Sequence, residues 1–317
     1  MGLRCRGGGA GTSGDGVSTA SGACPSGETI DRWYNHVGTT TAPADEIAQH
    51  VAVVNRQLDG DAEAAAMELV AREGDDGMRA ANQLADLDSG ARSGVTQALN
   101  DGVPAQEVSR ALNRYGELSP EQKSQFEQIV GHSDSTVGNS WLRTVGSDDV
   151  EATEVGTALR RVDDIQENNH EIEKFLTAKK ANKKFDGNPP HESGSIVIDF
   201  RINNQDTFYR VYDEQHGAPG QFLTRESELK SLNSPDEVID RLGLLPEAWE
   251  RNYDSVARLE FAGNEDVAIR KSTVGKMESE RTGEVAEGGG TQYLLKQQVN
   301  DGWEPHSSLE DFIDQGG

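Results

Sequence analysis

The sequence predicts an α+β protein, with an all-helical region first and a small mixed β domain second. Apolar residues recur at helical spacing through residues 43–186. The breaker Asp186-Gly187-Asn188-Pro189-Pro190 follows, and after it apolar and polar residues alternate as they do in strands. We therefore divide the chain into a head over residues 1–42, a helical domain over residues 43–186 and a β domain over residues 190–317.

The head is rich in Gly, Ser and Thr, a composition typical of linkers and disordered segments. It contains both cysteines of the chain, Cys5 and Cys24, and no Cys/His cluster has the spacing of a metal site. No apolar stretch of the kind found in signal peptides follows Met1. We expect a protein that is cytoplasmic as made and that needs another route if it is exported or delivered to a target cell.

The formal net charge of −25 excludes a general affinity for nucleic acid, because phosphates are repelled by such a surface. The acidic residues are spread along the chain and lysine is scarce, which is typical of surfaces adapted to high salt. No apolar run approaches the ~20 residues that a membrane-spanning helix requires.

The helical domain shows periodic apolar positions separated by glycine-containing breaks. Ser119 followed by Pro120 is a typical helix start, with serine as the N-cap and proline at the first helical position. His50, His132 and His170 have no acidic residue at useful spacing, and we interpret them as solvated or packed histidines. We expect helices over residues 43–58, 62–72, 78–87, 95–99, 108–115, 119–130 and 149–184.

The β domain combines short β-branched and aromatic runs with one main helix. That helix is expected to begin at Ser234-Pro235, a second Ser-Pro start followed by acidic residues. The triple glycine 288–290 leads into the last strand and can adopt backbone conformations that bring it close to a ligand. We expect strands over residues 195–202, 207–212, 221–224, 256–261, 267–269 and 292–295.

Four segments of this domain, in order, resemble the NAD-glycohydrolase domains of the tuberculosis necrotizing toxin (TNT) family, which have the ADP-ribosyltransferase-like fold. The resemblance covers roughly residues 195–304. It departs from the family pattern in the longer turn Asp213–Gly217 and in the stretch Glu247–Tyr253. The matching segments are Phe208-Tyr209-Arg210-Val211-Tyr212, Gly220-Gln221-Phe222-Leu223-Thr224, Asp240-Arg241-Leu242-Gly243-Leu244-Leu245-Pro246 and Gly288-Gly289-Gly290-Thr291-Gln292-Tyr293-Leu294-Leu295.

The resemblance implies a toxin that hydrolyses the nicotinamide–ribose bond of NAD, with NAD as substrate, no other cofactor, no metal and an immunity protein as partner. Gln292, Arg210 and Arg241 take the catalytic positions, with Gln292 where many ADP-ribosyltransferases carry glutamate. Contacts with NAD are implied for Phe222, Thr224, Gly290 and Tyr293. These residue types suit the substrate, because arginine can clasp a diphosphate through paired hydrogen bonds and an aromatic ring can pack on nicotinamide.

Three other functions remain open on the sequence. An ADP-ribosyltransferase that modifies a macromolecule would use the same residues. A toxin nuclease would need paired histidines, a metal triad or a basic groove, and the sequence offers none of these. A non-enzymatic interaction module would leave the ordered series of motifs unexplained.

Overall fold

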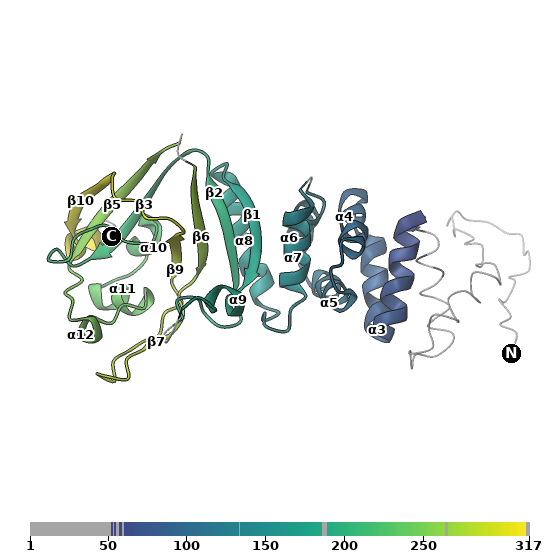
Figure 1. The fold of residues 1–317 in the computed structure, drawn as a ribbon, viewed down its shortest axis with the longest axis horizontal. Coiled ribbons are helices and arrows are strands. Elements are labelled where there is room, and N and C mark those ends of the chain that lie inside the picture. Colours follow the sequence, from purple (N-terminus) through teal and green to yellow (C-terminus); the bar gives the residue numbers. More distant parts are fainter. Residues whose placement is uncertain are drawn as a thin grey trace, which may run out of the picture.

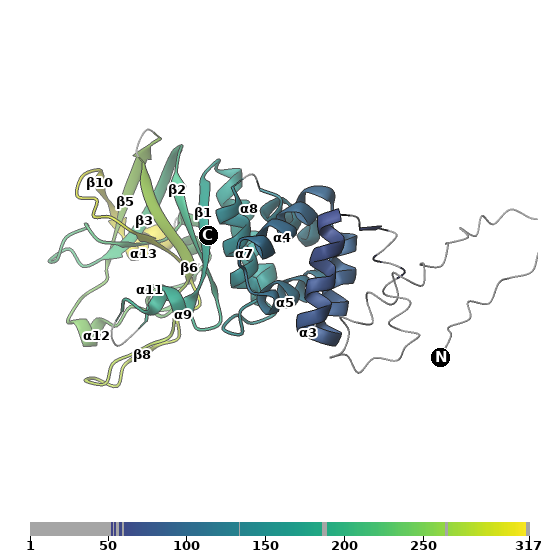
Figure 2. The same cartoon turned by 45° about the vertical axis from the view of Figure 1, so that its right-hand side comes forward.

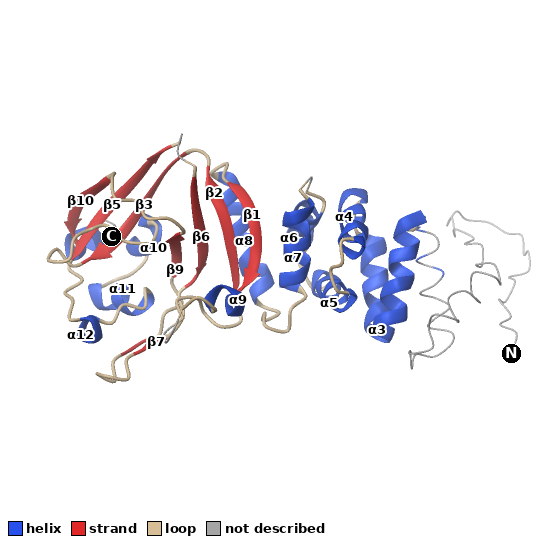
Figure 3. Cartoon of the chain, viewed as in Figure 1, coloured by secondary structure: helices blue, strands red, loops and turns tan. Residues whose placement is uncertain are grey.

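The computed structural model describes residues 52, 54, 57–58, 60–132, 134–185, 189–263 and 266–314. It confirms the α+β class, since helices dominate the first half of the described chain and sheets the second (Figures 1 and 3). The predicted head and most of the first expected helix lie outside the described residues. Within the described part of the chain, each helix is too short or too polar to cross a membrane.

The helical region packs short helices around alanine, leucine and valine side chains. The first helix is kinked at Gly74 (φ 56°, ψ −123°), between the two helices expected over residues 62–72 and 78–87. Its glycine is in the left-handed region, which glycine adopts at little cost. The helices of this region are α3 (Gly60–Asp86), α4 (Ser89–Asn100), α5 (Ala105–Gly116), α6 (Pro120–Val130) and α7 (Ser135–Val145).

The two Ser-Pro sequences both begin helices, as predicted. At α6, the Ser119 hydroxyl accepts a hydrogen bond from the Gln122 amide, and the Gln122 side chain accepts one from the Ser119 amide. This reciprocal pair satisfies two amide groups that a helix start leaves without partners. At α11 (Pro235–Arg241), the Ser234 hydroxyl accepts a hydrogen bond from the Glu237 amide, and the Glu237 side chain accepts one from the Asn233 amide.

The prediction of a single helix over residues 149–184 is wrong. The structure instead has helix α8 (Glu154–Glu167), strand β1 (Glu171–Thr177) and the short helix α9 (Ala178–Asn182). The chain leaves α8 through Asn168 and Asn169, and Asn169 has φ 55°. Asparagine tolerates this left-handed conformation better than most residues, so the pair ends the helix and frees the next residues to pair as a strand.

Strand β1 extends the main sheet across the predicted domain boundary. It pairs antiparallel with β2, from Glu171 opposite Arg201 to Thr177 opposite Ile196. The five-stranded sheet has the order β1-β2-β6-β9-β4, and a three-stranded sheet has the order β10-β5-β3. The remaining strands are β2 (Ile196–Ile202), β3 (Gln205–Tyr212), β4 (Phe222–Leu223), β5 (Ser255–Ala262), β6 (Val267–Thr273), β9 (Thr291–Leu295) and β10 (Trp303–Ser308), with β7 (Met277–Glu278) and β8 (Val285–Ala286) forming a separate hairpin.

Helices α7 and α8 lie against β1 and β2 (Figure 2). One apolar core includes side chains of the helices and of the sheet. Trp141 of α7 meets Phe175 of β1 edge-on, with ring centroids 4.7 Å apart. On the same face of the sheet, Phe200 of β2 contacts the ring of Tyr293 of β9 at 6.4 Å. The sequence break at residues 186–190 therefore falls between two strands that pair with each other. The same apolar core includes residues that precede the break and residues that follow it.

These contacts predict that a fragment beginning at residue 190 will not fold stably, whereas one beginning at residue 148 will. The shorter fragment lacks α8 and β1 and uncovers Ile198, Phe200 and Tyr293, which are fully buried. Uncovering three such side chains costs roughly 5–9 kcal/mol, comparable with the whole stability of a domain. Thermal melting followed by circular dichroism checks this, with the full chain as reference. A cooperative transition in the shorter fragment at the temperature of the longer one would contradict it.

Candidate functional site

A cavity of about 410 Å³ lies where the two sheets meet, and four of the predicted site residues line it. They are Arg210 on β3, Phe222 and Thr224 at β4, and Gln292 on β9. The volume falls within the range of ~300–1,000 Å³ that is usual for small-molecule sites. The other lining residues are Tyr209, Val211, Leu223, Leu242, Gly243, Leu244, Trp249, Arg251, Tyr253, Val274 and Met277.

The sheets are joined at this point by two main-chain hydrogen bonds between Tyr209 and Thr224. The Tyr209 amide donates to the Thr224 carbonyl at 2.9 Å, and the Thr224 amide donates back at 2.8 Å. The Thr224 hydroxyl also donates to the carbonyl of Thr291 on β9 at 3.1 Å. Thr224 therefore fixes β4 between β3 and β9, and its contribution to the cavity is a rigid wall.

Gln292 lines the cavity from a buried position, with 5% of its surface exposed. Its amide nitrogen donates to the carbonyl of Pro190 and approaches that of Thr273 at 3.5 Å. Both donors of the side chain are thus directed at main-chain carbonyls. The acceptor oxygen Oε1 is the atom through which this side chain can bind a ligand.

Arg210 directs its guanidinium along the turn that follows β3. Its Nη1 donates to the carbonyls of Ala218 and Pro219, the latter at 2.8 Å. A Cβ on Gly220 would lie 2.2 Å from the guanidinium carbon, so the glycine of the Gly-x-Phe-Leu-Thr segment provides the space that Arg210 occupies. Burial, and next the nearby Arg251, lower the pKa of Arg210.

The triple glycine contacts protein rather than the cavity. Gly288 and Gly289 have φ of 73° and 82°, and a Cβ on Gly288 would lie 2.6 Å from the carbonyl oxygen of Gly275. Gly290, predicted to contact NAD, packs on Arg241, whose carbonyl accepts from the Gly290 amide at 3.0 Å. Close backbone packing therefore explains these glycines, and the structure does not bring Gly290 to the cavity.

Tyr293 and Arg241 are also placed outside the cavity. Tyr293 is 1% exposed and faces the helical side of the sheet, because neighbouring residues of a strand point to opposite faces. Arg241 ends α11 with its guanidinium beside Gly289 and 3.9 Å from the carboxylate of Glu228. The structure therefore places Tyr293 on the face of β9 opposite to Gln292, and it places the guanidinium of Arg241 away from the cavity that Arg210 and Gln292 line.

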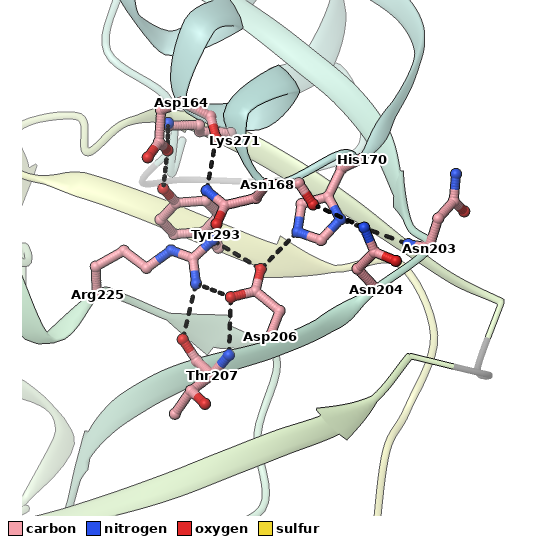
Figure 4. A network of polar contacts seen from close by, with 10 residues as sticks. All are labelled: Asp164, Asn168, His170, Asn203, Asn204, Asp206, Thr207, Arg225, Lys271 and Tyr293. Carbon is pink, nitrogen blue, oxygen red and sulfur yellow. Dashed lines mark hydrogen bonds and ion pairs between the residues drawn. The ribbon is translucent and has the colours of Figure 1, made fainter.

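Tyr293 belongs instead to a polar network behind the sheet (Figure 4). Its hydroxyl donates to Asp164 of α8 at 3.2 Å, and Lys271 of β6 pairs with the same carboxylate. Burial opposes the charge on Asp164, but the ammonium of Lys271 outweighs it, so the pKa of this carboxyl is lowered. Burial lowers the pKa of Lys271 in turn. These contacts tie β9 and β6 to helix α8.

The second half of the network confirms that His170 is packed and gives it an acidic partner that lies far away in the sequence. Nε2 of His170 lies 2.7 Å from the carboxylate of Asp206, and both side chains are buried. Arg225 pairs with the same carboxylate through both terminal nitrogens and also donates to the carbonyl of Thr207 at 2.8 Å. Burial would raise the pKa of Asp206, but the hydrogen bonds from His170 and Arg225 lower it to about 2.

The sequence prediction missed Trp249, Arg251 and Tyr253, which also line the cavity. They come from the stretch Glu247–Tyr253, where the chain departs from the family pattern. The sequence signal for these residues was the presence of aromatic side chains and an arginine in a short polar segment. Without a structure, such a composition does not indicate a binding site. Among the described residues, no group of three or more His, Cys, Asp or Glu side chains could hold a metal ion.

Comparisons with protein-family models, curated proteins and solved structures found no match.

His191 follows Pro190, whose carbonyl accepts a hydrogen bond from Gln292. The burial of His191 predicts that the free energy of unfolding decreases in acid. His191 is 1% exposed, its Nδ1 lies 2.7 Å from the Ser272 hydroxyl, and burial, followed by Arg270, lowers its pKa to about 4. In the unfolded chain, His191 is protonated as the pH falls through 6.5, whereas in the folded chain it is protonated only near pH 4. This contribution to stability is therefore complete above pH 6.5 and falls by about 3 kcal/mol toward pH 4.

Urea unfolding of the full chain between pH 5 and pH 7 measures this slope, above the range where ordinary carboxyl groups titrate. We expect His191→Gln to flatten the slope, and His132→Gln, at an exposed histidine, to leave it as in the wild type. An unchanged slope in His191→Gln would show that His191 is not the group responsible.

Proposed function

We propose that this protein is an NAD glycohydrolase of the TNT type, which hydrolyses the nicotinamide–ribose bond of NAD to nicotinamide and ADP-ribose. The observation that carries the proposal is the convergence of Arg210, Phe222, Thr224 and Gln292 on one cavity. These residues come from three of the four segments in which the sequence resembles this family. Segments that are distant in the sequence but meet around one cavity are expected of a ligand site.

The charge of the cavity supports an anionic substrate. Arg210 lines it, and within the described residues its guanidinium forms no ion pair with a carboxylate. In a chain of net charge −25, a half-buried arginine that has no carboxylate partner in the described part of the chain is unusual. A diphosphate bound there would supply the missing anion through paired hydrogen bonds.

The reaction needs little acid–base chemistry from the protein. The bond between ribose C1′ and the pyridinium nitrogen breaks with its electron pair going to nitrogen, and nicotinamide leaves as a neutral base. A water oxygen then bonds to C1′ and gives up its proton to solvent, through a state similar to that of glycosidases. In this proposal, Oε1 of Gln292 accepts a hydrogen bond from the ribose or the attacking water, Arg210 holds the diphosphate and Phe222 packs against nicotinamide.

The proposal is tested with the full chain in molar KCl, by following NAD and separating free ADP-ribose from protein-bound ADP-ribose. Free ADP-ribose in proportion to the NAD consumed supports hydrolysis. ADP-ribose attached to an added macromolecule would instead support the alternative, an ADP-ribosyltransferase. Stable NAD would contradict both. Action as a toxin and inhibition by an immunity protein are further proposals that follow from the same resemblance.

Gln292→Ala is expected to lower kcat for NAD hydrolysis by about 10²–10³, as is usual when a positioned polar group is lost at a reacting centre. It also removes the side-chain hydrogen bonds to the carbonyls of Pro190 and Thr273, which still accept from the amides of Gly275 and Glu192, so we expect a stability loss of about 0.5–1.5 kcal/mol. Ile129→Val on α6 serves as control, because it costs about 0.5–1.5 kcal/mol far from the cavity. The measurement is steady-state kinetics at a temperature well below the melting temperatures of both variants. Similar kcat values for the two variants would contradict the role of Gln292.

Gly220→Ala is expected to act on Arg210 without unfolding the protein. The added methyl group would meet the flexible end of the Arg210 side chain and displace its guanidinium. Losing a charge-assisted hydrogen bond to the diphosphate should raise KM roughly tenfold to a hundredfold with little change in kcat. Gly90→Ala in α4 is the control, since its Cβ would make only an ordinary contact with Asp88. An unchanged KM in Gly220→Ala would argue against Arg210 as a substrate contact.

A further inference from the structure

The stretch over residues 246–253 brings a second arginine and a second aromatic ring to the cavity. Arg251 and Trp249 both line it, together with Tyr253. Neither Arg251 nor Arg210 is ion-paired with a carboxylate of the described residues, and each guanidinium is close enough to Tyr253 to oppose the rise in the pKa of its hydroxyl. Burial still raises the pKa of Tyr253 to about 12. Two like charges near one hydroxyl in a partly buried site repel each other, and an anion bound between them would relieve this repulsion.

Two of the aromatic rings that line the cavity are exposed, whereas most large apolar side chains of the described residues are buried. Phe222 and Trp249 are each 43% exposed. The Trp249 ring stands edge-on to Tyr253, with centroids 6.3 Å apart and an interplanar angle of 74°. An exposed indole held in this way offers a flat face to a heteroaromatic ring.

The short helix α12 (Pro246–Trp249), which carries Trp249, is fastened at both ends by the β7–β8 hairpin. Glu284 accepts from the Ala248 amide at 2.9 Å. Arg281 donates to the Glu247 carbonyl at 3.0 Å and pairs with the Glu250 carboxylate at 3.1 Å. The stretch is therefore held by hairpin side chains that contact its main chain and the Glu250 carboxylate, as expected for a preformed binding wall.

After α12, a left-handed residue turns the chain so that Arg251 and Tyr253 line the cavity. Glu250 has φ 55° and ψ 45°, a left-handed conformation that is costly for a residue other than glycine. Next, the Asn252 amide donates to Asp213 at 2.8 Å. Asp213 begins the other turn in which the sequence departs from the family pattern, so the two departures are joined to each other beside the cavity.

We propose that Arg251 and Trp249 form the subsite for the adenosine diphosphate half of the dinucleotide, with the indole stacked on adenine and Arg251 sharing the diphosphate with Arg210. Phe222 belongs to the other half, because its strand pairs with that of Gln292. Two exposed rings, and two guanidiniums that have no acidic partner in the described ranges, match the two heteroaromatic rings and two phosphates of NAD. The identity of the dinucleotide rests on the proposed function, whereas binding of ADP can be measured without it.

Isothermal titration calorimetry of the full chain with ADP, in molar KCl, tests the subsite directly. We expect Arg251→Gln and Trp249→Ala each to weaken ADP binding about tenfold or more. Trp249→Phe keeps a stacking ring and should restore most of the affinity. Arg79→Gln removes the same charge from exposed α3 and should bind ADP as the wild type does.

The substrate nicotinamide mononucleotide separates this inference from the proposed function. If both hold, Arg251→Gln lowers kcat/KM for NAD but leaves that for the mononucleotide, which lacks the adenosine half, nearly unchanged. An active enzyme whose ADP affinity does not respond to Arg251→Gln or Trp249→Ala would overturn the subsite alone. An inactive wild-type protein whose ADP binding still depends on both residues would overturn the hydrolysis and support the subsite. Wild-type protein that does not bind ADP would overturn the subsite whatever its activity.

Discussion

The ion pair between Arg225 and Asp206 holds the walls of the cavity in place from behind. Asp206 is the second residue of strand β3, and Arg225 directly follows Thr224, where β4 meets β3. The guanidinium also lies over the rings of Phe208 and Tyr293, 4.0 Å and 5.0 Å from their centroids, so one side chain connects β3, β4 and β9. Because both partners are largely buried, removing one would leave an uncompensated charge, at a cost of about 3–5 kcal/mol. The angle between the two sheets, and hence the shape of the cavity, depends on this contact.

Local signals in the sequence were sufficient for much of the fold. The Ser119-Pro120 and Ser234-Pro235 starts, the break near Gly74 and the alternating strands after residue 195 all have their cause within a few residues. Strand β1 was missed because Glu171–Thr177 is short, and its partner β2 lies beyond the breaker. What makes this segment a strand is the edge of β2 and the cover of α7, and neither is visible in its own periodicity.

The position of a candidate site residue could be predicted where the residue belongs to a sequence motif. It could not be predicted where packing determines the direction in which the side chain points. Arg210, Phe222, Thr224 and Gln292, which the ordered motifs assign to the site, line one cavity. Strand alternation requires Gln292 and Tyr293 to point to opposite faces, so a stricter use of that rule would have predicted that only one of them faces this cavity. The direction of Arg241 depends on its contacts with Gly289 and Glu228, and the contribution of Trp249 depends on the β7–β8 hairpin. These are long-range contacts that the local sequence does not specify.

The acidic surface and the cationic cavity are compatible because they act over different distances. Exposed carboxylates repel an anionic ligand through solvent, where the Debye length falls from about 10 Å at 0.1 M salt to about 3 Å at 1 M. The guanidiniums of Arg210 and Arg251 would act across direct hydrogen bonds in a partly buried cavity, where salt screens little. Molar salt therefore weakens the long-range repulsion more than it weakens the local attraction. A protein of net charge −25 can in this way bind a diphosphate without a basic surface, provided that the arginines of the site have no acidic partners of their own.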